Sequence, residues 1–378
     1  VDAYYGPEEW REEARKDPRN QAALKREADR IHRALVAFKG VGAEEVQRAR
    51  VLATNVASAR FRLDMIGGTR VQFADEAERL FALRPQLKPL SAYDAPLRRI
   101  EALLPGPAPL AERVDAFRTR YIVPDDRLPA VMDAAIAECR KRTLAHIALP
   151  EGENFRMSMV KDKSWGAYNY YKGGNQSVIE INTDLPVLVS NALVLGCHEG
   201  YPDHHVQGIY TERAYRSRGW AEFSVLPLYA PAAPLNEGGA DFGVDLAFPG
   251  EERTAFERDV LFPLAGLDPA GAAAYAEFRK AMADLDGAAL TVSQMYLDGV
   301  VDKPRAIELV QRYELVARDV AEKSLDFDEE YRSYVINYAS GEDLVRAYVD
   351  RAGADPASRW KAYEHILSTP TLPSDLTK

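Results

Sequence analysis

Histidines and carboxylates are concentrated in one short segment, and these side chains could carry out metal chemistry. Residues 196–207 read GCHEGYPDHHVQ and contain three of the six histidines of the chain. Glu199 directly follows His198, and the adjacent His204 and His205 come six and seven residues after His198. Imidazole and carboxylate groups are common zinc ligands in proteins. The segment therefore predicts either a polar loop or a metal site.

The pair His198–Glu199 is the first half of the HExxH signature of zinc hydrolases. In that signature two histidines one turn apart bind the metal and the glutamate acts as general base. Here the second histidine comes six or seven residues after the first instead of four. A regular helix would therefore separate the two side chains by about 9–10 Å along its axis, too far for both to bind one ion. Pro202 offers a solution, since proline removes a helical hydrogen bond and forces the turn to widen or break. Gly200 makes that distortion easier.

A carboxylate from a following helix is the usual third protein ligand of such a site. Glu237 in LNEGGADFG lies 39 residues after His198, and Glu222 in RGWAEFS, 24 residues after it, is a rival. The pattern Asn-Glu-Gly-Gly-Ala-Asp favours Glu237, with Asn236 as a candidate helix cap. Asp241 lies four residues after Glu237 on the same helix face, where it could accept a hydrogen bond from a ligating imidazole.

These motifs resemble those of a known family. HEGYPDHHVQ looks like the HExxPGHH motif of a large, mostly uncharacterised bacterial family of predicted metallopeptidases. LNEGGADFG is similar to that family's second motif and to the NEG-A segment of gluzincin aminopeptidases. The resemblance covers most of the chain, including VDAYYGP, RFRLDMIGGT and RSYVINYASGEDLVRAY. Asp203 departs from the family pattern, which has Gly there, so its carboxylate is expected either to contact a ligand or to disturb the turn.

The resemblance implies a gluzincin-like zinc hydrolase that acts on short peptides or amides. It implies one zinc ion, or another divalent metal, with Glu199 as general base. The implied ligands are His198, His204 and Glu237, and His205 is the alternative second histidine ligand.

Residues outside the two motifs are candidates for contacts with the reacting substrate. Tyr338, in SYVINYASG, is expected to stabilise the oxyanion, with the glycine of that segment allowing a sharp turn. Arg332 could bind a substrate carboxylate. Tyr334 and Tyr338 are also four residues apart, as expected for one packed helix face. Tyr168 lies in a segment that could form an edge strand along which an extended peptide binds.

Two other classes of function fit parts of the same pattern. Two histidines and one carboxylate also describe the facial triad of non-haem iron(II) oxygenases, although Glu199 has no role there. A helical binding protein with a purely structural metal is the third reading, and it predicts that Glu199→Gln changes nothing measurable.

The hydrophobic periodicity predicts a mainly α fold with one small β-hairpin or sheet. Apolar residues recur three and four apart from Asn20 to about Ile147, whereas 164–184 alternates as strands do. We expect a helical N-terminal region at 1–150 and a metallopeptidase-like catalytic region at 151–378, packed together as one unit. A buried helix before His198 is expected to deliver the histidines.

The bulk composition narrows the partners. A net charge of −10 disfavours nucleic acid and anionic membranes as partners, and no apolar run approaches membrane-spanning length. Cys139 and Cys197 allow one bridge but do not require it, and Cys197 is interpreted as a small buried residue. The chain is expected to be soluble, with the cytoplasm favoured over the periplasm or secretion.

Overall fold

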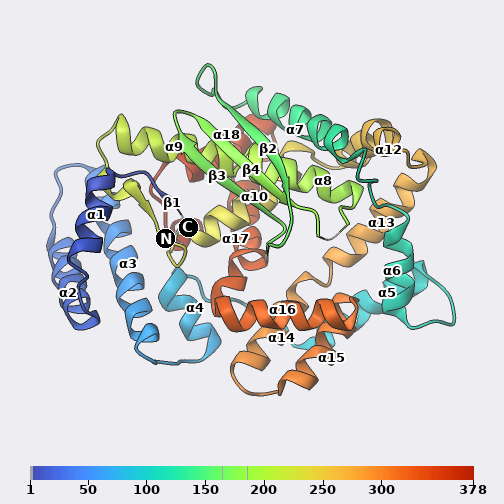
Figure 1. Cartoon of the computed structure of the whole chain (residues 1–378), viewed down its shortest axis with the longest axis horizontal. Coiled ribbons are helices and arrows are strands. Elements are labelled where there is room, and N and C mark those ends of the chain that lie inside the picture. The colour runs from blue at the N-terminus through green and yellow to red at the C-terminus, as the bar shows by residue number, and fades with distance from the viewer. Residues whose placement is uncertain (1–2, 164, 185) are drawn as a thin grey trace.

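The computed structural model describes residues 3–163, 165–184 and 186–378. Helices dominate this part of the chain, and a small sheet lies against them (Figure 1). The prediction of a mainly α fold with a small β element is confirmed. Among the described residues, no helix combines the length and the hydrophobicity needed to cross a membrane.

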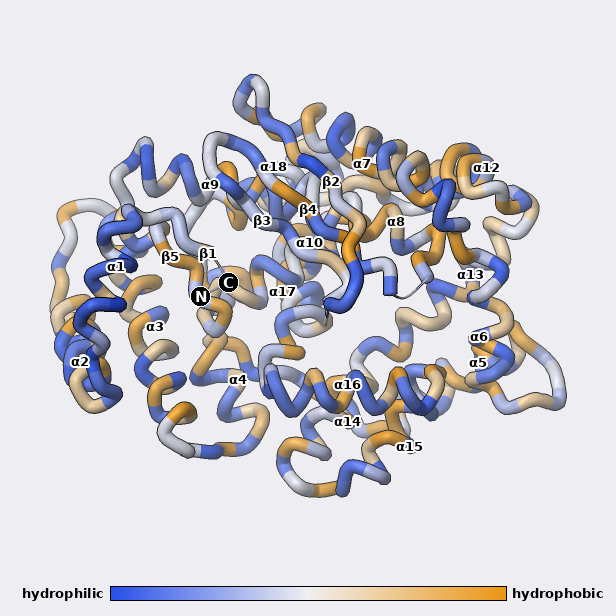
Figure 2. The backbone as a smooth tube through the Cα atoms, viewed as in Figure 1, coloured by the Kyte–Doolittle hydropathy of each residue, from blue (hydrophilic) through white to orange (hydrophobic). Residues whose placement is uncertain are grey.

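Residues 8–144 are mostly helical, as the hydrophobic periodicity predicts from Asn20 onward. The most N-terminal helix, α1, is almost wholly hydrophilic in Figure 2 and has no buried residue, so it lies on the surface. The helices of this region are α1 (Glu8–Lys16), α2 (Gln21–Ala37), α3 (Ala43–Ile66), α4 (Phe73–Phe81), α5 (Asp94–Leu103), α6 (Leu110–Thr119) and α7 (Leu128–Leu144).

A three-stranded sheet follows, and the sequence predicted only two of its strands. The predicted hairpin consists of β3 (Ala167–Gly173) and the antiparallel β4 (Gln176–Asn182). The missed strand, β2 (Asn154–Val160), pairs in parallel with β4, so the order is β2-β4-β3 and β3 is an edge strand. Every second residue of β4 is buried, which turns one sheet face to the core.

The remaining chain is again mostly helical. The N-terminal strand β1 (Ala3–Tyr4) pairs with β5 (Val225–Leu226), which lies more than 220 residues later in the sequence. The helices are α8 (Val189–Leu195), α9 (His204–Arg216), α10 (Ala233–Ala247), α11 (Glu252–Phe256), α12 (Phe262–Ala265), α13 (Ala272–Ala283), α14 (Asp286–Leu297), α15 (Lys303–Glu314), α16 (Arg318–Tyr331), α17 (Ala339–Arg351) and α18 (Pro356–Ser368).

The buried apolar residues form two clusters, and each combines residues from before and after position 150. The larger cluster extends from Tyr93 on the N-terminal side to Leu376 near the C-terminus. The smaller one packs Phe61 and Phe81 against Tyr334 and Ile336. Burial of this apolar surface is the main favourable contribution to folding, so both parts of the chain share it.

Helices α10 and α17 cross at two glycines, and the contact fixes the helix that carries Glu237. A Cβ atom on Gly238 would lie 2.0 Å from the backbone carbon of Gly341, and one on Gly341 would lie 2.3 Å from the carbonyl oxygen of Pro234. Gly341 therefore permits a close helix crossing inside α17, whereas the sequence had suggested a sharp turn. Backbone atoms cannot move aside as a flexible side chain can, so this crossing requires glycine on both helices.

We predict that Gly341→Ala lowers the free energy of unfolding by about 3 kcal/mol, because the added methyl group overlaps the backbone of α10. Gly42→Ala is the matched control, since nothing lies within 4 Å of a Cβ atom at that position, and it should cost less than about 1 kcal/mol. Denaturant unfolding measures both. Equal effects of the two substitutions would contradict the close crossing.

Candidate metal centre

The backbone changes geometry between the two histidines, as the sequence predicted. Helix α8 continues into a π-helical turn at Gly196–Gly200, which contains His198. A non-helical link through a cis Tyr201–Pro202 peptide bond follows, and α9 begins at His204. The two histidines therefore belong to different helices, and the axial separation expected for one regular helix does not apply.

Three side chains from these elements and from α10 converge. One ligand atom each from His198, His204 and Glu237 lies within 4.8 Å of the others. The Nε2 atoms of His198 and His204 lie 3.7 and 3.8 Å from the same carboxylate oxygen, Oε2 of Glu237. The two imidazole rings are almost perpendicular, with centroids 4.7 Å apart. The cluster therefore presents two nitrogens and one oxygen around a common centre.

A carboxylate stands behind each of the two imidazoles. Nδ1 of His198 lies 3.0 Å from Oδ1 of Asp241, and Nδ1 of His204 lies 3.4 Å from Oδ1 of Asp203. Contacts of this kind place the ring proton on Nδ1 and leave Nε2 free to bind a metal, while they also raise the basicity of the ring.

Asp203 is part of a buried network rather than a disturbance of the turn. Its side chain is fully buried, and its Oδ2 accepts a hydrogen bond from the hydroxyl of Tyr363 on α18. A Cβ atom on Gly239 would lie 3.0 Å from that same oxygen, so the glycine leaves the room that the carboxylate occupies. The residue that departs from the family pattern thus contacts His204 from behind.

His205 faces away from the cluster. It is fully buried, its Nδ1 lies 2.7 Å from Oγ of Ser177, and its Nε2 lies 3.0 Å from Oε2 of Glu153. Glu153 also accepts a hydrogen bond from Arg140. Both ring nitrogens of His205 are therefore used in a network between α9 and the sheet, and His204 is the histidine that joins the cluster.

Glu199 lies next to the cluster with a carboxylate that is largely shielded from solvent. It is 5% exposed, and its Oε2 has no hydrogen-bond partner among the described residues. Burial raises its pKa, while the nearby imidazoles of His198 and His204 oppose that rise. The Asn169 amide of β3 donates to the backbone carbonyl of Glu199 at 2.5 Å, which ties the π-helical turn to the edge strand. An unpaired buried carboxylate beside such a cluster is suited to accept a proton.

Two tyrosines of the C-terminal motif lie at the cluster. Burial and then the charge of Glu237 raise the pKa of Tyr338, with further contributions from Asp241 and Glu199, so its hydroxyl stays protonated and is a donor. Tyr334 donates to Oε1 of Glu237 at 2.9 Å, which leaves Oε2 for the two histidines. The sequence analysis assigns Tyr334 only a packing role. Its spacing of four residues from Tyr338 was the one sequence feature that could have placed it at the site together with Tyr338.

Three other candidate residues are not brought to the cluster. Arg332 donates through Nε to the buried carboxylate of Glu76 at 2.8 Å, so its guanidinium is held by an internal ion pair. Tyr168 alternates with Asn169 along β3 and therefore points to the opposite sheet face, where its ring packs on Tyr170. The rival ligand Glu222 is engaged by Arg48 through two hydrogen bonds of 2.7 and 2.9 Å.

The pKa values of the three clustered side chains are shifted by their neighbours, in directions that favour positive charge on the imidazoles and negative charge on Glu237. Burial alone would lower the pKa of His198, but its hydrogen bond with Asp241 and the nearby carboxylate of Glu237 raise it to about 10. The pKa of His204 is likewise raised, against burial, by Asp203 and Glu237. Burial would raise the pKa of Glu237, but both histidines hold it well below its usual range. A cation bound between these side chains would compete with protons on the imidazoles, so metal binding would release protons.

A disulfide bond fastens the turn that carries His198. Cys197 is bonded to Cys139 of α7, and both residues are fully buried. The interpretation of Cys197 as a buried residue is correct, but the sequence did not decide whether it is bonded to Cys139.

The prediction that Asn236 caps the helix of Glu237 is wrong, because α10 begins at Ala233 and Asn236 lies inside it.

The comparisons with known proteins identify a fold but no function. No protein-family model matches the chain, and no curated protein does either. A similar solved structure is described as "the putative lipoprotein from Colwellia psychrerythraea", with a TM-score of 0.58 and 14% sequence identity. The match covers 92% of this chain and 64% of that one, so the chain spans less than two thirds of that protein. At this identity the likeness concerns the fold alone.

We predict that replacing both cysteines, as Cys139→Ala with Cys197→Ala, lowers the free energy of unfolding by about 2–4 kcal/mol, because the bridge closes a long loop in the unfolded chain. Denaturant unfolding with and without dithiothreitol measures the effect. Reductant should destabilise the wild-type protein and leave the double variant unchanged. A wild-type transition that ignores reductant, together with a double variant of wild-type stability, would contradict this.

Proposed function

We propose that this protein is a zinc-dependent hydrolase that cleaves peptides or related amides. The observation that carries the proposal is the convergence of His198, His204 and Glu237 beside the buried carboxylate of Glu199, whose Oε2 has no hydrogen-bond partner among the described residues. The resemblance of the two motifs to the HExxPGHH family and to gluzincin peptidases agrees with this arrangement.

The donor set fits a zinc ion in type and spacing. Zinc is bound tetrahedrally by imidazole and carboxylate at about 2.0–2.2 Å, which places neighbouring ligand atoms about 3.3–3.5 Å apart. The corresponding separations of 3.7 and 3.8 Å exceed this by only a few tenths of an ångström. The side chains of His198, His204 and Glu237 keep 13–18% of their surface exposed, so a substrate can approach.

In the proposed reaction, His198, His204 and Glu237 would hold the zinc ion, and the residues around them would bind and transfer protons. A zinc ion would supply Lewis-acid chemistry, by polarising the scissile carbonyl and making water more acidic. Glu199 accepts a proton from the attacking water and delivers it to the leaving amine. Tyr338, kept protonated by its surroundings, donates a hydrogen bond to the oxyanion. Asp241 and Asp203 hold the two imidazoles in place.

The edge strand β3 provides a place for an extended substrate. Its outer edge has no partner strand among the described residues, and its Asn169 side chain contacts the backbone of Glu199. A peptide added along this edge would form backbone hydrogen bonds while passing the general base. Tyr168 could then contact such a peptide only through its ring, on the sheet face opposite to Asn169.

A non-haem iron oxygenase uses the same three ligand types, and a structural metal site would also use them. The position of Glu199 favours the hydrolase, because an oxygenase or a structural site has no use for a buried unpaired carboxylate there. Metal analysis with amide-cleavage and oxygen-uptake assays separates the three.

The disulfide bears on where the protein works. Stable disulfides occur mainly in oxidising compartments outside the cytoplasm. The fully buried Cys139–Cys197 bond therefore supports an extracytoplasmic location over the cytoplasmic one favoured by the sequence.

We predict that His204→Gln weakens zinc binding at least about 100-fold, since loss of an outer hydrogen-bond partner alone costs 10–100-fold. His205→Gln is the matched control, because it changes the adjacent histidine, which is bonded to Ser177 and Glu153 instead. Zinc titration against a competing chelator measures both. Retention of zinc by the His204 variant and its loss by the His205 variant would reverse the assignment.

We predict that Glu199→Gln lowers kcat for peptide cleavage about 10²–10⁴-fold, because the amide cannot accept the proton from water. Zinc content and folding stability should stay close to those of the wild-type protein, since Gln has the same shape and Glu199 makes no side-chain hydrogen bond through Oε2. Steady-state kinetics on a peptide library, with metal analysis of the same samples, tests this. Undiminished cleavage by the variant would exclude Glu199 as the base.

A further inference from the structure

A cavity of about 120 Å³ lies beside the candidate metal centre, and Glu237 forms part of its wall. Its walls come from α3, α9, the segment 222–232, the start of α10, Tyr334, and the end of α18 with the segment that follows it. They are mostly apolar, and include Leu52, Ala214, Phe223, Leu228, Ala233 and Ile366.

The cavity adjoins the group formed by His198, His204 and Glu237, because the two share residues and one face of α9. Glu237 and Tyr334, which are hydrogen-bonded to each other, both line it. On α9 the lining residues Gln207, Thr211 and Ala214 come three, seven and ten positions after His204, and thus lie on the helix face of that histidine. A group in the cavity would therefore lie next to a group held at the metal.

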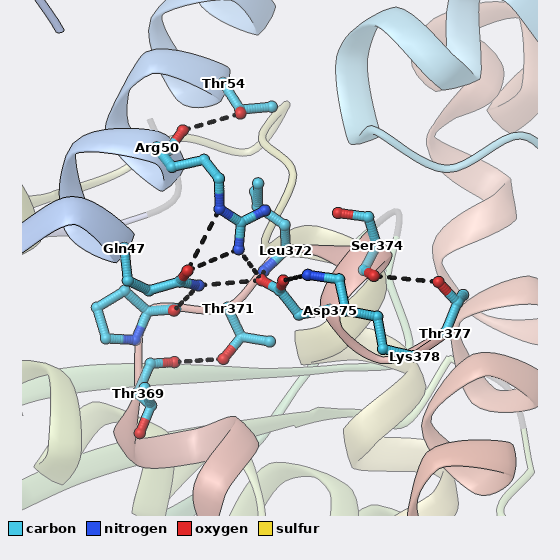
Figure 3. A network of polar contacts seen from close by, with 11 residues as sticks. Gln47, Arg50, Thr54, Thr369, Thr371, Leu372, Ser374, Asp375, Thr377 and Lys378 are labelled. Atoms are coloured by element: carbon cyan, nitrogen blue, oxygen red, sulfur yellow. Dashed lines mark hydrogen bonds and ion pairs between the residues drawn. The ribbon is translucent and has the colours of Figure 1, made fainter. Parts of the chain in front are cut away.

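The outer wall is fixed by a network of polar contacts (Figure 3). Gln47 of α3 donates to the carbonyl oxygen of Pro370 at 2.9 Å and to Asp375 at 3.0 Å. Arg50 pairs with the same Asp375 carboxylate, which also accepts from the backbone of Leu372 at 3.0 Å. These contacts hold the C-terminal segment against α3, so the cavity is formed before any ligand arrives.

The size and chemistry of the cavity indicate what it can hold. A dry cavity of about 150 Å³ accommodates benzene in another protein, so this one matches a single aliphatic or aromatic side chain. The wall also contains Asn55, whose Oδ1 is buried and has no hydrogen-bond donor among the described residues. Such an acceptor is unfavourable until a ligand N–H reaches it.

We propose that this cavity is a specificity pocket that takes one medium-sized apolar side chain of the substrate, adjacent to the bond that is cleaved. The inference rests on the proposed hydrolase function and narrows its substrates to peptides or amides with such a residue at that position. Asn55 accepts a hydrogen bond from a backbone N–H of the same substrate.

The test measures binding and cleavage separately. N-acetyl amides of glycine, alanine, leucine and phenylalanine are titrated into the metal-free protein, and peptides that vary at one residue are digested by the zinc-loaded protein. Ala214→Leu fills the pocket and Leu52→Ala enlarges it. The matched controls are Ala283→Leu, on an exposed helix end, and Leu63→Ala, a partly buried leucine of α3 outside the cavity.

We expect the leucine amide to bind at least 10-fold more tightly than the glycine amide, since each methylene in an apolar pocket is worth about 10–200-fold. Ala214→Leu should abolish this preference without affecting the glycine amide, and Leu52→Ala should shift it toward phenylalanine. The controls should keep the wild-type order.

Equal binding of all four amides, or the same order in both pocket variants, would overturn the pocket. Cleavage without any preference at the varied residue would also overturn it and would leave the hydrolase function standing. A leucine preference in binding, lost in Ala214→Leu, from a protein that binds no zinc and cleaves nothing would keep the pocket and refute the hydrolase.

Discussion

The convergence of His198, His204 and Glu237 depends on the interruption of the helix between Gly196 and His204. A continuous helix would hold His198 and His204 about 9–10 Å apart along its axis. Two ligands of one zinc ion cannot be that far apart, because each zinc–ligand bond is only about 2 Å long. The π-helical turn and the link through Pro202 assign the two histidines to separate helices that can converge. The molecule then stabilises this irregular segment from several sides: the Cys139 disulfide, the Asn169 contact from β3 and the packing of α10.

The electrostatics of the cluster follow from the carboxylates that stand around it. Asp241 and Asp203 each contact the far nitrogen of a histidine, and Glu237 faces the near ones. In a metal-free protein this arrangement holds protons on the imidazoles; with a cation present, the same carboxylates orient neutral imidazoles toward it. The arrangement therefore suits a cation at its centre better than it suits any neutral group.

The sequence was informative where chemistry is local and uninformative where it joins distant segments. Motif spacing and Pro202 predicted a distorted turn that could bring a later histidine to His198, and the resemblance to the HExxPGHH motif implied His198, His204 and Glu237 as ligands. Helical periodicity predicted most of the helices. The role of Asp203 depends on Tyr363, 160 residues away. The ion pair of Arg332 with Glu76 joins residues 256 positions apart, so the sequence pattern around Arg332 could not predict it and favoured a substrate contact instead. Strand β2 was missed because its half-exposed residues become a strand only by pairing with β4.

The glycines of the motifs show a related limit. Gly238 and Gly341 come from segments about a hundred residues apart, and each is explained only by the close approach of the other helix. A sequence pattern records that glycine stands there, but the requirement comes from packing in three dimensions.

The most direct measurement of the central claim is a crystal structure of the zinc-soaked protein, with anomalous data collected on both sides of the zinc edge. The account predicts one zinc peak about 2.0–2.2 Å from Nε2 of His198, Nε2 of His204 and a carboxylate oxygen of Glu237. A peak at other residues, or none at saturating zinc with these three side chains turned apart, would contradict it.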